Sequence, residues 1–167
     1  MREAQERMTM SPKERIDGLV PSEKRKLTHT IVHEAGHAAK AILLGLRVSG
    51  YVIGDYGWGD QGAYKKPKGV VDGKVILNQA IGETDWERKL KMSAASGAAA
   101  ELVYFGYINS TAGQQKVDRL TGNFRSYREI DEMANKIADE LEASEIFYEC
   151  IRRMARGEAL DDLSVKT

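Results

Sequence analysis

The chain has 167 residues, 30% of them charged, and its 25 basic and 25 acidic side chains give a formal net charge of zero. Without a basic field on its surface we expect no nucleic-acid partner. The single cysteine, Cys150, excludes an internal disulfide framework and a zinc site built from thiolates. The longest apolar stretch, 38–46, contains Lys40 and is far too short for a bilayer, and the polar first ten residues are unlike a secretory signal. We therefore expect a soluble, cytoplasmic protein without membrane insertion.

Residues 1–20 are rich in charge and are predicted to form a flexible or loosely helical N-terminal segment, followed by a single domain over 21–167. Ser22 comes after a proline and before an acidic residue, which is typical of a helix N-cap. Apolar residues then recur with a helical period as far as Leu46, and Gly45 is a plausible stop. The pattern predicts one helix over about 22–45.

The next segment has the pattern of a small sheet. Residues 48–53 predict a strand and are followed by the glycine-rich stretch 54–62, which forms either a mobile lid or a packed loop. Two more short strands are predicted at 70–71 and 74–77, with a hairpin turn at Asp72-Gly73 between them.

Three further helices are predicted. The first begins at a capping box, Thr84-Asp85-Trp86-Glu87, runs through a stretch of small residues at 93–100 that lets another helix approach closely, and ends near Gly106. The others cover about 127–141 and 146–154. The fold class we expect is mainly α (α+β).

The predicted helix over 22–45 contains the sequence His33-Glu34-Ala35-Gly36-His37, an H-E-x-x-H motif. Two histidines four residues apart point from the same face of a helix and can bind one Zn²⁺ ion. The glutamate between them then lies beside the water at the open position of the metal, where it can act as the general base. The motif therefore predicts His33 and His37 as metal ligands and Glu34 as the catalytic residue.

A catalytic zinc ion normally has three protein ligands, so a third must come from elsewhere in the chain. His29 lies on the same helical face, but three positions four residues apart span about 12 Å of helix, whereas the Zn–N distance is about 2 Å. His29 is therefore a poor candidate. The residues alone leave Glu101 and Asp118 as equal candidates.

The chain resembles the peptidase domain of the FtsH-type zinc proteases over about 27–141. His33-Glu34-Ala35-Gly36-His37-Ala38 matches the family motif H-E-A-G-H-A, and 97–106 (GAAAELVYFG) is similar to G-R-x-A-E-E-x-x-F-G. Thr111-Ala112-Gly113 and, a few residues later, Asp118-Arg119-Leu120 are similar to T-G-A-S-x-D-L. The chain departs from the family at Ala98, where arginine is usual, and in a longer loop before Asp118.

The resemblance implies a helical, zincin-like peptidase domain with a small β-sheet beside the metal-binding helix. It implies that Asp118 is the third zinc ligand, and that Glu101 lies behind the metal histidines and orients one of them. It also implies that residues 51–53 are an edge strand that receives a peptide by strand addition; a half-buried strand of a small sheet is the alternative.

The function we expect is a zinc-dependent metalloendopeptidase that hydrolyses flexible or unfolded polypeptides. Only 32 residues precede His33 and no phosphate-binding loop is found, so we expect no ATPase module, and a separate unfoldase could deliver substrates. One alternative is a regulatory protease of one specific partner. The other is a zinc-binding interaction module that no longer cleaves.

Overall fold

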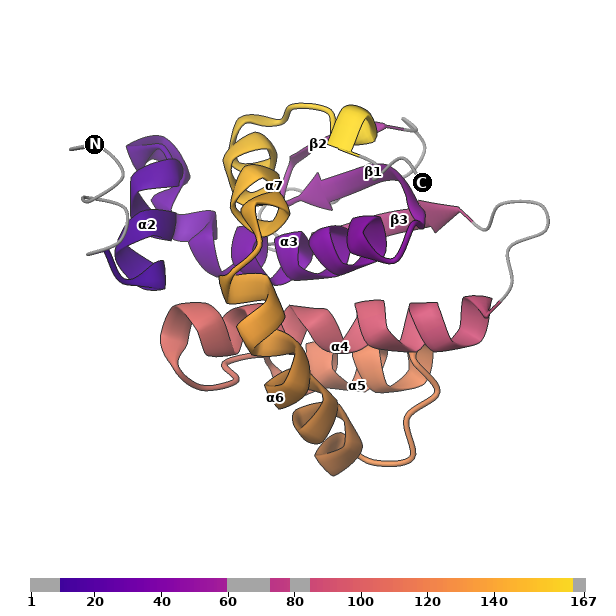
Figure 1. The fold of residues 1–167 in the computed structure, drawn as a ribbon. Coiled ribbons are helices and arrows are strands. Elements are labelled where there is room, and N and C mark those ends of the chain that lie inside the picture. The colour runs from indigo at the N-terminus through magenta and orange to yellow at the C-terminus, as the bar shows by residue number, and fades with distance from the viewer. Residues whose placement is uncertain (1–9, 60–72, 79–84, 164–167) are drawn as a thin grey trace.

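The computed structural model describes residues 10–59, 73–78 and 85–163 (Figure 1). Most of these residues are helical and the strands form one small antiparallel sheet, which confirms the predicted mainly α (α+β) class. Within the described residues no helix is both long and apolar enough to cross a bilayer. The elements in chain order are α2 (Pro12–Leu19), the 3-10 helix η1 (Ser22–Leu27), α3 (Thr28–Leu43), β1 (Arg47–Ile53), β2 (Tyr56–Gly59), β3 (Gly73–Asn78), α4 (Trp86–Phe105), α5 (Ala112–Thr121), α6 (Tyr127–Glu142), α7 (Glu145–Arg156) and the 3-10 helix η3 (Asp161–Leu163).

Helix α3 is the centre of the molecule. It lies between α4 on one side and the sheet with α7 on the other (Figure 1). Small residues bring α3 and α4 together: a Cβ atom on Gly36 would lie 2.2 Å from the carbonyl oxygen of Ser96. Residues 93–100 of α4 are all buried, so the predicted close approach of a second helix along this stretch is confirmed. His33 and His37 therefore lie on a helix that is fixed on both sides.

The sheet has the strand order β2-β1-β3, so β1 is its central strand. Tyr51 pairs with Trp58 of β2 and with Val75 of β3. The expectation that residues 51–53 form an edge strand is therefore wrong, and they are fully buried rather than half-buried. The outer strand next to α3 is β3.

The glycine-rich stretch contributes a strand where a lid or loop was expected. A Cβ atom on Gly57 or Gly59 would lie 2.2 Å from a carbonyl oxygen of β1, so glycine permits the close approach of β2. Residues 60–62 of this stretch lie outside the described residues, and so do the predicted strand at 70–71 and the first residue of the predicted Asp72-Gly73 turn.

The first described residues form a helix. Of the two predicted possibilities for this segment, flexible or loosely helical, residues 12–19 adopt the helical one as α2. Ser11 and Glu14 form a capping box at its start, and the side chain of Ile16 is completely buried in the core. Ile16 and Val20 belong to the same buried cluster as residues of the later helices.

The helix boundaries are partly as predicted. Ser22 is not the N-cap of the long helix, because residues 22–27 form η1 and α3 begins at Thr28. Gly45 follows the end of α3 with a φ angle of 80°, which confirms the predicted stop. Asp85 occupies the N-cap position of α4 without capping it through its side chain, and Thr84 of the predicted capping box lies outside the described residues. The predicted helices at 127–141 and 146–154 are confirmed as α6 and α7, whereas α5 was not predicted.

Candidate metal centre

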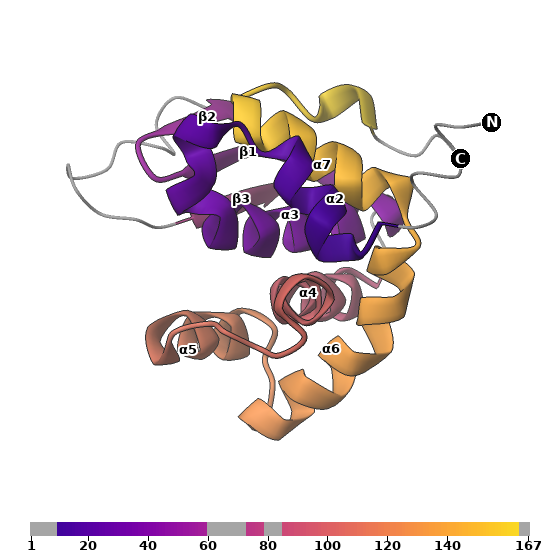
Figure 2. The ribbon, with the colours of Figure 1, turned by 90° about the vertical axis from the view of Figure 1, so that its left-hand side faces the viewer.

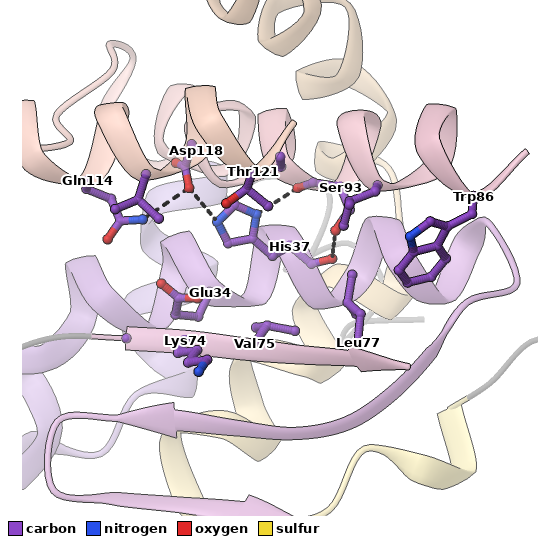
Figure 3. A pocket seen from close by; sticks show the side chains of 14 residues that line it. Glu34, His37, Lys74, Val75, Leu77, Trp86, Ser93, Gln114, Asp118 and Thr121 are labelled. Atoms are coloured by element: carbon purple, nitrogen blue, oxygen red, sulfur yellow. Dashed lines mark hydrogen bonds and ion pairs between the residues drawn. The ribbon is translucent and has the colours of Figure 1, made fainter. Parts of the chain in front are cut away.

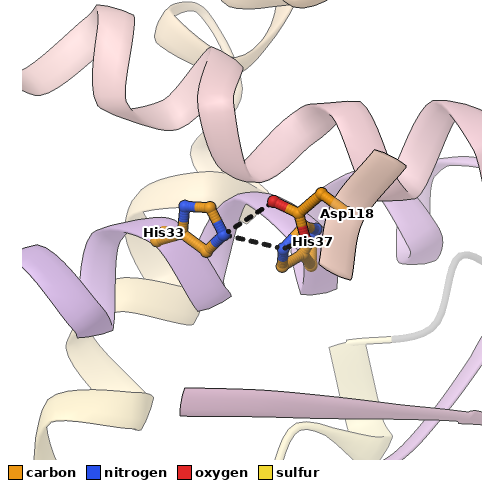
Figure 4. Close-up of side chains that lie close together, drawn as sticks. All are labelled: His33, His37 and Asp118. Atoms are coloured by element: carbon orange, nitrogen blue, oxygen red, sulfur yellow. Dashed lines mark hydrogen bonds and ion pairs between the residues drawn. The ribbon is translucent and has the colours of Figure 1, made fainter. Parts of the chain in front are cut away.

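Three side chains from two helices meet beside α3. His33 and His37 come from α3 and Asp118 from α5 (Figure 4). One ligand atom from each lies within 4.8 Å of the other two. The Asp118 carboxylate oxygens lie 3.3 Å from His33 Nε2 and 3.7 Å from His37 Nε2, and the two Nε2 atoms are 3.1 Å apart. Atoms bound to one tetrahedral zinc ion at about 2 Å lie about 3.3 Å apart, so this spacing suits a single metal ion.

The ring nitrogens that face away from this point are held by the protein. His37 Nδ1 donates a hydrogen bond to the carbonyl oxygen of Ser93 at 2.7 Å, and the Ser93 hydroxyl donates to the carbonyl oxygen of His37 at 3.0 Å (Figure 3). His33 Nδ1 bonds to the carboxylate of Glu101. With both Nδ1 atoms occupied, the Nε2 atoms are left for a metal ion.

Glu101 is completely buried behind His33 and does not belong to the three-residue ligand cluster. Besides His33, it accepts hydrogen bonds from His29 Nε2 at 3.2 Å, from the backbone N–H of Asn109 at 2.7 Å and from the hydroxyl of Ser110. Burial alone would raise the pKa of Glu101, but the hydrogen bonds from His29 and His33 lower it to about 2. Glu101 is therefore an ionised carboxylate, and His29 contacts it outside the ligand cluster.

The electrostatics of the candidate site are dominated by carboxylates around His33. Burial alone would lower the pKa of His33, but hydrogen bonds to Asp118 and Glu101 and the charge of Glu34 raise it to about 10. Three carboxylates thus surround one imidazole. This negative potential favours a positive charge between the histidines and Asp118.

Glu34 lies next to the cluster. Its side chain is 3% exposed and lies between α3 and β3 (Figure 3). A Cβ atom on Gly73, the first residue of β3, would lie 2.5 Å from Glu34 Cγ, so the backbone of β3 packs directly against this side chain.

Gly97 has a role that was not predicted from the sequence. A Cβ atom at this position of α4 would lie 2.5 Å from His33 Nε2 and 2.7 Å from His37 Cε1. Glycine is thus needed where α4 passes over the two imidazole rings. The signal was present in the sequence as the glycine within the small-residue stretch 93–100.

Two adjoining cavities flank the cluster and share Glu34, Gly73 and Gln114. The larger, of about 440 Å³, lies between β3, α4 and α5 (Figure 3), and the smaller measures about 230 Å³. We refer to the two cavities together as the cleft. Glu34 lines both of them, and they differ in chemical character. The larger cavity has an apolar wall of Val75, Leu77, Trp86, Leu90 and Val117, and the smaller has polar groups from His29, Thr30, Ser110 and Thr111.

Comparisons with protein-family models, with curated proteins and with solved structures find no match for this chain.

Proposed function

We propose that this chain is a zinc-dependent metalloendopeptidase with a zincin-like domain, as its resemblance to the FtsH-type peptidases implies. The observation that carries the proposal is the meeting of His33, His37 and Asp118 next to the Glu34 carboxylate. These groups lie where two adjoining cavities meet, so a polypeptide in the cleft would pass directly over them.

The donor set fits zinc. Two imidazoles and one carboxylate are ligands that catalytic zinc ions use, and three protein ligands leave a fourth position for water or substrate. A zinc ion at this point supplies Lewis acidity, which lowers the pKa of a water molecule and polarises the carbonyl group of the substrate. Gly97 leaves room for both imidazole rings, and Ser93 and Glu101 fix their orientation.

Glu34 is the general base of the proposed reaction. Its carboxylate accepts a proton from the attacking water molecule and then donates it to the nitrogen of the leaving amine as the peptide bond breaks. The packing of Gly73 against this side chain limits its movement.

The substrate we propose is a flexible or unfolded polypeptide. Within the described part of the chain β3 pairs with β1 alone, and four of its residues line the larger cavity. An extended peptide can add to such an outer strand through backbone hydrogen bonds. Folded proteins do not offer an extended segment of this kind, so a separate unfoldase could deliver them. We place the activity in the cytoplasm, where the unpaired Cys150 stays reduced.

The test is cleavage of an unfolded protein and a mixed peptide library by the wild-type chain and by Glu34→Gln, with the zinc content measured in both. We expect both proteins to hold zinc and Glu34→Gln to lose about 10²–10⁴-fold in turnover, because the proton acceptor is gone. Glu132→Gln is the matched control, since Glu132 is exposed on α6, and it should cleave like the wild type.

The outcomes separate the alternatives. Full activity in Glu34→Gln would reject the mechanism. Bound zinc without cleavage of any substrate would indicate a zinc-binding interaction module. Cleavage of one protein alone in a cell lysate would indicate a regulatory protease with a specific partner.

A further inference from the structure

Helix α5 is held in an unusual way. It exposes its large apolar side chains, with Val117 55% and Leu120 62% accessible, and the one buried side chain that it contributes is that of Asp118. The next helix, α6, buries a complete apolar face in the core. Apolar burial, which fixes α6, therefore contributes little to holding α5 in place.

The two ends of α5 are anchored. Before the helix, Glu101 accepts hydrogen bonds from the backbone of Asn109 and the hydroxyl of Ser110. After it, Phe124 is buried, and a Cβ atom on Gly122 would lie 2.3 Å from the Phe124 ring. Between these anchors, Asp118 reaches from the helix to the two histidines of α3.

An isolated helix of ten residues is barely stable in water, and apart from Gln114 on the same helix, the partners of the Asp118 carboxylate within the described residues are His33 and His37 of α3. A metal ion on His33 and His37 would add a divalent charge and a direct ligand bond to the contacts that Asp118 already makes with these histidines. We infer that metal binding docks α5: the ion holds the helix against α3 through Asp118, and without the ion α5 moves away from α3 between its two anchors. The inference rests on the proposed metal site.

The position of α5 gives this motion a consequence for substrate binding. Figures 1 and 2 place the helix next to α4 at the periphery of the molecule. Gln114, Val117 and Thr121 of α5 form one wall of the larger cavity (Figure 3). The cleft is therefore complete only when the metal is bound. If bound metal raises the affinity for a peptide that contacts this wall, then by linkage the peptide raises the affinity for the metal by the same factor.

Hydrogen exchange of the full chain, measured by mass spectrometry with a chelator or with zinc, tests the inference. We expect zinc to slow exchange of the α5 amides by about tenfold or more and to leave α6 and α7 unchanged. In Asp118→Ala, at zinc concentrations where His33 and His37 are still occupied, this protection should disappear. Asp131→Ala, at an exposed position of α6, is the control and should respond to zinc like the wild type.

Equal exchange of the α5 amides with and without zinc in the wild type would overturn the inference and leave the peptidase proposal intact. Full zinc-dependent protection of α5 in Asp118→Ala would also overturn it. Failure of the wild type to bind zinc would overturn both proposals.

Discussion

The two histidines of the candidate site are each fixed from behind, but by groups of different charge. Ser93 offers His37 a neutral carbonyl oxygen, whereas Glu101 offers His33 an ionised carboxylate. A carboxylate at this position makes the imidazole a better metal ligand, because it stabilises positive charge on the ring. Glu101 also holds the loop that leads to Asp118, so it influences two of the three ligands.

Glu101→Gln should therefore weaken zinc binding by about 10- to 100-fold, since a neutral amide supports His33 less well. Competition with a chromophoric chelator measures the affinity. Unfolding of the metal-free protein, followed in parallel, separates a loss of affinity from a loss of fold. An unchanged zinc affinity would show that Glu101 does not act on the ligands.

A methyl group at Gly97 should abolish the site. In Gly97→Ala the new Cβ atom would lie 2.5 Å from His33 Nε2, so α4 or the imidazole rings must move, and zinc content should fall strongly. Gly113→Ala is the matched control, because the nearest atom to its new Cβ is 3.9 Å away. Normal zinc content in Gly97→Ala would contradict the packing described here.

Cys150 should be inert in the native protein. Burial raises the pKa of its thiol to about 12, so at pH 8 almost none of it is the reactive thiolate. A chromogenic disulfide reagent should react with no thiol in the native state and with one per chain in denaturant. Rapid reaction of the native protein would show that α7 opens readily.

For individual residues, the sequence predicts those relative positions that the geometry of one helix determines. His33 and His37 share a helical face because they are four residues apart, and Glu34 lies three residues before His37, so no tertiary information is needed. The residues alone left Asp118 and Glu101 equal, because the choice depends on how α4 and α5 meet α3. Gly97 was missed for the same reason, since its requirement exists only where α4 crosses the histidines.

At the scale of elements, α2 is part of the core although its sequence is charged. Ile16→Ala should lower the free energy of unfolding by about 2–5 kcal/mol, because it leaves a cavity under a completely buried side chain. Lys13→Ala on the same helix removes an exposed ion pair with Asp17 and should leave the free energy of unfolding nearly unchanged. Urea unfolding monitored by fluorescence gives both values. Equal small losses would show that α2 detaches without cost to the domain.

The helices and the strand that were not clearly predicted have weak sequence patterns, and the reason can be given for each. Ile16 is the one fully buried side chain of α2 and stands among charged residues, so the sequence left a flexible and a helical form open. In β2 the glycines that permit close pairing with β1 are the same residues that suggest a loop. Helix α5 has no buried apolar face from which a helical period could be read. Helices α6 and α7 were predicted because each buries a regular apolar face.

At the scale of the whole molecule, composition and periodicity predict the class but not the arrangement. The position of α3 between α4 and the sheet depends on contacts between small residues such as Gly36, which have no periodic signal. The strand order places β3, and not β1, beside Glu34. The surroundings of the H-E-x-x-H motif therefore emerge only from the assembled fold.

The separation of the ligands along the chain has a consequence for the timing of activity. During synthesis His33, Glu34 and His37 emerge before Asp118, and the whole of α4 lies between them in the chain. Such long-range contacts form late, after chain segments between them have ordered. A nascent chain would thus carry the base and two histidines without a complete ligand set. The proposed hydrolase would remain silent on the ribosome, and retention of zinc would report that the chain has finished folding.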